Sequence, residues 1–117
     1  MISKDNAEHY LWGQHCDGWH LVKSAELSVI HERMPAGASE VRHFHTRSHQ
    51  FFFVLSGMAT LEIAGKREIL GRHEGAEVLP GVPHQMLNEH EQDVEFIVVS
   101  QPPSQSDRVL VAEQEEN

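Results

Sequence analysis

The chain has few of the features that would assign it to an extracellular or membrane class. Its single cysteine, Cys16, excludes an internal disulfide, and this fits a reducing compartment. No apolar run approaches the roughly 20 residues of a membrane-spanning helix. The first residues also lack the basic flank and the apolar core of a secretion signal. We therefore expect a cytoplasmic protein with no membrane partner.

Basic residues are also scarce. Nine Lys and Arg stand against eighteen Asp and Glu, so the net charge is −9, and no basic cluster is present. A surface of this sign does not suit a phosphate backbone, so we expect no nucleic-acid partner. A length of 117 residues fits one domain with a genuine core.

Short β-forming segments recur along the chain, with Gly- and Pro-rich turns between them. This pattern predicts an all-β antiparallel sandwich or barrel. One short helix is expected near residues 6–10. The predicted strands cover residues 19–23, 27–34, 41–45, 51–55, 60–64, 68–70, 77–79, 84–87 and 94–100.

Histidines with metal-ligand spacing are the most informative feature. His43 and His45 are two residues apart in a predicted strand, so their side chains point to the same face. Gln50 follows after a short polar turn, and His84 lies in a second turn-then-strand context. Three imidazoles and one amide oxygen make a plausible donor set for a divalent transition metal. Hydrogen-bonded core histidines are the alternative interpretation.

The spacing around these residues resembles the first motif of the cupin family. That motif reads Gly, five residues, His-x-His, three or four residues, Glu, six residues and Gly. The corresponding residues here are Gly37, His43, His45, Gln50 and Gly57.

A second cupin motif is matched less completely. The family has Gly, five residues, Pro-x-Gly, two residues, His, three residues and Asn. Gly81, His84 and Asn88 keep this spacing, whereas Gly75 and Pro80 are separated by four residues and Pro80 adjoins Gly81 directly. The two motifs span residues 37–88. The resemblance implies a double-stranded β-helix, or jelly-roll, barrel with little helix.

The resemblance also implies one divalent metal held by His43, His45, Gln50 and His84. Gln50 replaces the usual Glu, and the adjacent His49 is the alternative fourth ligand; only Gln50 keeps six residues before Gly57. The ion could be Fe, Mn, Ni, Zn or Cu, since imidazole suits all of them.

Other residues are candidates for the pocket. Phe52, Val54 and Met86 share the phase of the ligands, so they are expected either to line the substrate pocket or to form barrel core. Cys16 has no evident base, which favours a structural thiol over a nucleophile. Candidate acid–base groups, with a solvated strand face as the alternative, are Glu32, Glu40 and Arg42.

Three parts of the chain are predicted to differ in role. Residues 1–24, which carry Trp12 and Trp19, are expected to pack on the barrel, either flanking its mouth or covering its outer face. Residues 25–103 form the cupin barrel, and residues 104–117 form an extension whose end we expect to be disordered. The apolar set Phe51, Phe53 and Leu55 needs a cover, which predicts a homodimer.

Two functions follow from these expectations. The first is a metalloenzyme of isomerase, lyase or dioxygenase type that acts on a small oxygenated or carboxylate-bearing molecule. The second is a non-catalytic module that binds a sugar-like or carboxylate ligand. A metal-free, epimerase-like jelly roll is disfavoured by the histidine pattern, and nothing in the sequence names a substrate.

Overall fold

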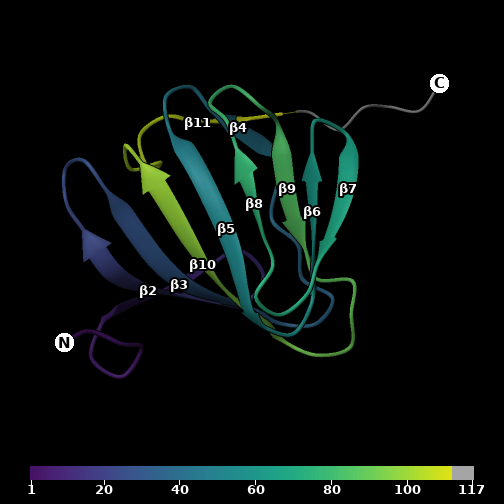
Figure 1. Ribbon diagram of the computed structural model, residues 1–117, viewed down its shortest axis with the longest axis horizontal. Coiled ribbons are helices and arrows are strands. Elements are labelled where there is room, and N and C mark those ends of the chain that lie inside the picture. The colour runs from purple at the N-terminus through teal and green to yellow at the C-terminus, as the bar shows by residue number, and fades with distance from the viewer. Residues whose placement is uncertain (112–117) are drawn as a thin grey trace.

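The computed structural model describes residues 1–111, which form two antiparallel β-sheets that face each other (Figure 1). The larger sheet has six strands in the order β1-β2-β3-β10-β5-β8, and the smaller has five in the order β11-β4-β9-β6-β7. The strands are β1 (Glu8–Trp12), β2 (Cys16–Lys23), β3 (Ser28–Met34), β4 (His43–His45), β5 (His49–Ser56), β6 (Ala59–Ile63), β7 (Lys66–Leu70), β8 (Gly75–Val78), β9 (His84–Leu87), β10 (Val94–Gln101) and β11 (Arg108–Leu110).

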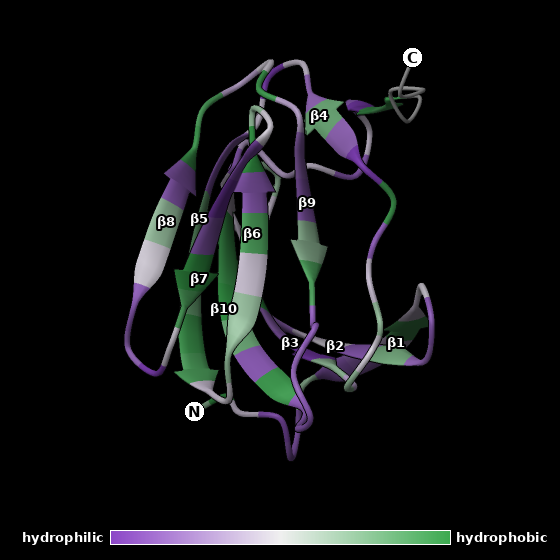
Figure 2. Cartoon of the chain, turned by 90° about the vertical axis from the view of Figure 1, so that its right-hand side faces the viewer, coloured by the Kyte–Doolittle hydropathy of each residue, from purple (hydrophilic) through white to green (hydrophobic). Residues whose placement is uncertain are grey.

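This arrangement confirms the predicted double-stranded β-helix. The core lies between the sheets because alternate residues of each strand face inward. On β5 and β10 the buried residues include Phe52, Val54, Phe96 and Val98, and hydrophobic bands run along both strands in Figure 2. These strands pair in register, with Phe52 opposite Val98.

The predicted helix near residues 6–10 is wrong. Residues 3–7 form a turn in which the Ala7 amide donates to the Ser3 carbonyl at 2.9 Å, and the chain then enters β1. Tyr10 and Trp12 point to one face of this strand, and β1 pairs along its whole length with β2. Tertiary pairing therefore overrides the local preference. Within residues 1–111 there is no helix of the length and hydropathy needed to span a membrane.

Both ends of the described chain join the sheets. The hairpin of β1 and β2 extends the larger sheet, and β11 pairs with β4, placing Arg108 opposite His45 and Leu110 opposite His43. Residues 112–117, on which the expectation of a disordered end falls, lie outside the described residues.

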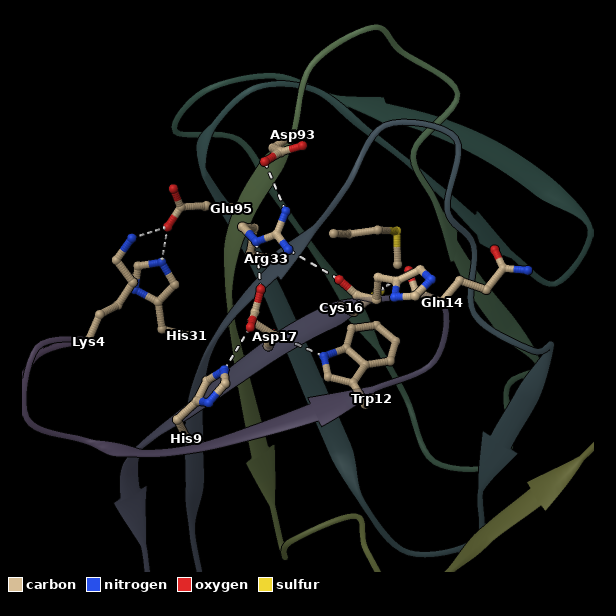
Figure 3. Close-up of polar contacts among 12 residues, drawn as sticks. Lys4, His9, Trp12, Gln14, Cys16, Asp17, His31, Arg33, Asp93 and Glu95 are labelled. Atoms are coloured by element: carbon tan, nitrogen blue, oxygen red, sulfur yellow. Dashed lines mark hydrogen bonds and ion pairs between the residues drawn. The ribbon is translucent and has the colours of Figure 1, made fainter.

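A polar network on the outer face holds the amino-terminal hairpin in place (Figure 3). The Arg33 guanidinium donates from Nε to Asp17 at 2.6 Å and from Nη1 to Asp93 at 2.9 Å. Lys4 donates to Glu95 at 2.7 Å and lies over the ring of Trp19. Trp19 thus belongs to the outer face, whereas Trp12 faces inward.

Candidate metal centre and cavity

The three predicted histidines converge inside the barrel. His43 and His45 lie on β4 and His84 lies on β9, with His43 directly opposite His84 in the ladder. Each side chain is at most 5% exposed, and the three potential ligand atoms lie within 4.8 Å of one another. Strand alternation explains the convergence, because both His43 and His45 face inward while Phe44 faces outward.

The hydrogen bonds of the histidines orient their ring nitrogens. The Nδ1 atoms of His43 and His84 lie 2.8 Å from the Val41 carbonyl and 3.0 Å from the Val82 carbonyl. A carbonyl only accepts, so both Nδ1 atoms carry the proton and both Nε2 atoms keep a free lone pair. Ligating histidines usually make this kind of second hydrogen bond.

His45 has a carboxylate in the same role. Its Nδ1 lies 3.0 Å from Oδ1 of Asp107, whose other oxygen accepts from the backbone amides of Arg47 and Ser48 at 2.9 and 2.8 Å. Despite burial, these three partners hold the pKa of Asp107 below its usual range. A neutral His45 therefore donates to an ionised Asp107 and presents Nε2 to the other two imidazoles.

Burial keeps the three imidazoles neutral. Desolvation lowers the pKa of His43 to about 3 and that of His84 to about 4, and it also lowers the pKa of His45. Neutral imidazole is the form that coordinates a metal.

Gln50 and His49 occupy opposite faces of β5. Gln50 is 5% exposed and lines the same cavity as His43 and His45; its amide Nε2 donates to Ser100 Oγ at 3.0 Å. Its Oε1 is buried without a hydrogen-bond partner within residues 1–111, and so is Nε2 of His84. His49 faces outward and meets Glu77 at 2.6 Å.

These observations test whether the residues fit a metal ion. Gln50 Oε1 and His84 Nε2 are two buried acceptor atoms without partners within residues 1–111. Burying them costs folding free energy unless a donor or a metal ion binds them. Three imidazole nitrogens with their Nδ1 atoms already bonded and one free amide oxygen are the donors that a divalent transition metal prefers. The four side chains therefore fit such an ion.

The sequence matches the family model described as the cupin domain over residues 30–100, more than half of the chain. The chain belongs to the cupin family. No curated protein matches the sequence.

Solved structures show the same fold at low sequence identity. The KdgF protein of a Halomonas species is 16% identical, with a TM-score of 0.82 over 90% of this chain and 94% of that one. The polyketide cyclase RemF of Streptomyces resistomycificus is 18% identical, with a TM-score of 0.82 over 98% and 87%. A predicted oxalate decarboxylase of Thermotoga maritima is 17% identical, with a TM-score of 0.77 over 88% and 99%.

His43 and His45 of this cupin open onto a cavity of about 360 Å³. Phe52 and Met86 line it, whereas Val54 lies wholly buried in the core, as the barrel-core interpretation expected. Asn88 is buried away from the cavity, where its amide donates to the Met34 carbonyl at 3.0 Å and the Gln92 carbonyl at 2.8 Å.

Several cavity residues lie outside the part of the chain that matches the family model. Tyr10 and Trp12 on β1 and His20 on β2 form one wall, and Arg108 on β11 lies at another. Trp12 is fixed by its indole Nε1, which donates to the Asp17 carbonyl at 3.1 Å (Figure 3). The sequence placed Tyr10 only within a segment expected either to flank the barrel mouth or to cover the outer face. It gave no sign of Arg108 or Asp107, because no local motif marks them.

Of the three candidate acid–base groups, Glu32 and Glu40 line this cavity. Arg42 does not; its Nη2 lies 3.5 Å from Glu62. Cys16 is fully buried, and burial raises the pKa of its thiol to about 11, which fits the structural role expected of it.

Proposed function

We propose that this cupin binds one divalent transition metal through His43, His45, His84 and Gln50 and acts on a small oxygenated or carboxylate-bearing molecule in the adjoining cavity. The observations that carry the proposal are the convergence of three neutral imidazoles, two of which line the cavity, and the free oxygen of Gln50, which lines the same cavity. The outward position of His49 favours Gln50 as the fourth donor.

The residues around the site would bind and orient such a ligand. A bound divalent ion would supply Lewis acidity that polarises ligand oxygens. The donor set adds no negative charge, because the three imidazoles are neutral and the Gln50 amide replaces the usual carboxylate. Arg108 adds a positive charge whose field reaches the histidines. This balance favours an anionic ligand, and Phe52 and Met86 supply apolar walls.

The cavity favours an enzyme over a non-catalytic binding module because it contains groups able to move protons. Glu32 and Glu40 line it together with the Tyr10 hydroxyl. A module that only holds a ligand has no need of titratable side chains beside the bound molecule. Isomerase, lyase and dioxygenase chemistry remain the candidate reaction types.

The test is calorimetric. A panel of small 2-hydroxy and 2-oxo acids, each with its neutral amide as the control, would be titrated into metal-loaded protein and into chelator-treated protein. We expect the acids to bind the loaded protein at least tenfold more tightly than their amides, and this preference to fall after chelation. Equal binding of acids and amides to the loaded protein would contradict an anion-accepting metal site.

We also extend the proposal to assembly as a homodimer through the outer face of β5. Phe51 is 41% exposed there and stacks on Phe53, with ring centroids 6.1 Å apart. Phe53 in turn stacks on His73, so the loop before β8 covers only part of this face. The amino-terminal segment fixed by Lys4 lies instead over Trp19, at the β2 and β3 side of the sheet. A second copy is therefore the cover we propose for Phe51.

A further inference from the structure

Two carboxyl side chains reach the cavity from different elements. Glu32 projects from the inward face of β3, and Glu40 lies in the loop before β4. Both line the same cavity, and the charge of Glu40 raises the pKa of Glu32. The proposed metal ligands come from β4, β5 and β9, so Glu32 and Glu40 form a separate group of titratable side chains in the same cavity.

Glu40 is held firmly in place. Its Oε1 accepts from the Met86 amide at 2.9 Å, and its own amide donates to the Met86 carbonyl at 3.0 Å. The Gln85 side chain donates to the Glu40 carbonyl at 2.9 Å. No hydrogen bond within residues 1–111 uses the second carboxyl oxygen of Glu40. The backbone thus fixes one oxygen and leaves the other available to a ligand.

Glu32 sits beside a tyrosine whose position depends on a glycine. Gly18 on β2 is the ladder partner of Glu32. A Cβ atom at residue 18 would lie 2.3 Å from the Tyr10 ring, so the missing side chain makes room for that ring. The carboxyl of Glu32 has no hydrogen-bond partner in the described part of the chain, although it is surrounded by protein on most sides.

The two carboxyls cannot both ionise at low cost, since like charges near each other in a desolvated site repel. Burial and then the Glu40 charge raise the pKa of Glu32 well above its usual range. Burial raises the pKa of Glu40 to about 7, against the Met86 amide and Arg108, which favour ionisation. Glu40 therefore titrates near neutral pH, beside a Glu32 carboxyl whose pKa lies well above its usual range.

The other titratable groups near the pair do not replace it. Burial raises the pKa of Tyr10 and of Cys16, and the charge of an ionised Glu32 raises both further. Both groups therefore stay protonated at neutral pH. Burial lowers the pKa of His20, which lies on β2 in the same wall of the cavity. Arg108 is the cation that acts on both carboxyls.

Two further buried groups indicate that this cavity is built for a ligand. The His20 side chain is 8% exposed, lines the cavity and has no partner for Nδ1 within residues 1–111. Gln50 is 5% exposed, lines the same cavity and has an Oε1 without a partner within residues 1–111. Buried polar atoms of this kind are rare unless a bound group completes them.

We infer that Glu32 and Glu40 exchange a proton with a ligand in which a C–H carbon that carries a hydroxyl group lies next to a carbonyl group, so that the reaction is a proton-transfer isomerisation. This inference rests on the proposed function and narrows its three reaction types to one. The Glu40 carboxylate is the acceptor, because Glu40 lines the cavity and its second oxygen makes no hydrogen bond within residues 1–111. Glu32 is the neighbouring carboxyl that keeps its proton, so that Glu40 can ionise and accept a proton from the ligand.

The step balances without an oxidant. Glu40 takes the proton as the C–H bond breaks, and the bonding pair forms the C=C bond of an enediolate while the carbonyl pair moves to its oxygen. That oxygen takes the proton of the neighbouring hydroxyl group. An electron pair on the deprotonated hydroxyl oxygen then forms the new C=O bond. The C=C electron pair takes the proton back from Glu40 at the carbon that carried the original carbonyl. The product is the isomer with carbonyl and hydroxyl exchanged, and the carboxylate is regenerated.

The first test needs neither metal nor ligand. Carbon-13 NMR of the glutamate carboxyls in chelator-treated protein would follow Glu32 and Glu40 from pH 3 to 9. We expect two coupled steps, one of them near neutral pH, and a lower pKa for Glu32 in Glu40→Gln. Glutamine keeps the acceptor for the Met86 amide, so this variant should fold. Independent titration of both groups at ordinary carboxyl values would overturn the inference.

The second test measures proton exchange. Hydroxypyruvate and glyceraldehyde would be incubated with metal-loaded protein in heavy water, and loss of their C–H signals would be followed by proton NMR. We expect exchange above the buffer rate with at least one probe, a fall of 100-fold or more in Glu40→Gln, and no change in Glu62→Gln. Glu62 is the matched control, because it lies on the far face of β6 and meets Arg42.

The outcomes separate this inference from the proposed function. Coupled carboxyl titration in a protein that binds no metal would remove the proposed function and leave the pair intact. Metal binding with exchange that is absent for both probes, or equal in Glu40→Gln and the parent, would remove the pair's role and leave the metal site intact. Gly18→Ala tests whether the position of Tyr10 affects Glu32. The added methyl group should displace Tyr10 and change the Glu32 titration, while the metal content stays the same.

Discussion

Asp107 accepts a hydrogen bond from Nδ1 of His45 at 3.0 Å, across 62 residues of sequence. The same carboxylate binds two backbone amides at the turn before β5, so it joins the loop before β11 to the histidine cluster. This contact orients His45 and makes its Nε2 a better donor.

Asp107→Asn should therefore weaken metal binding about 10- to 100-fold. The measurement is competition for one divalent ion, such as Ni²⁺, against a chromophoric chelator. Asp93→Asn is the matched control, because Asp93 meets Arg33 on the outer face, away from the cavity. Equal affinity in Asp107→Asn and the parent would mean that His45 does not depend on this contact.

Replacing Gln50 should remove much of the bound metal, whereas replacing the adjacent His49 should not. Gln50 is buried with a free Oε1, whereas His49 faces outward and meets Glu77. Elemental analysis of Gln50→Ala and His49→Ala, purified side by side, checks this. Loss of metal in His49→Ala alone would assign the fourth position to His49.

Phe51→Glu should convert a dimer to a monomer, because a charge at the centre of an apolar interface is costly to desolvate. Light scattering at micromolar concentration measures the change. Val22→Glu is a suitable control, since Val22 is exposed at the far end of the same sheet. A parent protein that already has the 13.3 kDa mass of one chain would exclude the dimer.

Glu40→Gln should gain stability over the parent as the pH rises from about 4.5 to 7. The pKa of Glu40 is about 7 in the folded protein against an ordinary value of 4.5, so the unfolded chain releases this proton first. Stability from this group is therefore present below pH 4.5 and is lost as the pH rises to 7. The gain is at most about 3 kcal/mol.

Urea unfolding of both proteins at several pH values, with chelator present, would measure this difference. The histidines lose stability on acidification, because burial lowers their pKa values, but they are shared by parent and variant and cancel in the comparison. A constant difference between the two proteins from pH 4.5 to 7.5 would show that Glu40 titrates normally.

Much of the site could be predicted from sequence because its residues follow local rules. Strand alternation placed His43 and His45 on one face, and motif spacing added Gln50 and His84. The three histidines converge in the folded protein, and Gln50 lines the same cavity as His43 and His45. The barrel followed in the same way from short strands between Gly- and Pro-rich turns.

The remaining features depend on pairing between distant segments. Strand β11 forms because Arg108 and Leu110 pair with residues of β4, and β1 forms because it pairs with β2. No short-range pattern marks Asp107 as the partner of His45. Likewise, Tyr10 enters the cavity through the space left at Gly18, which only the folded ladder reveals.

Metal content provides the most direct test of the central claim. The parent, His84→Ala and His73→Ala would be purified without a tag, loaded with a divalent metal, desalted and analysed for metal per chain. His73 is the control because it stacks on Phe53 on the outer face. We expect about one ion per chain in the parent and in His73→Ala, and little in His84→Ala. A parent that retains no metal, or a His84→Ala variant that retains as much as the parent, would contradict it.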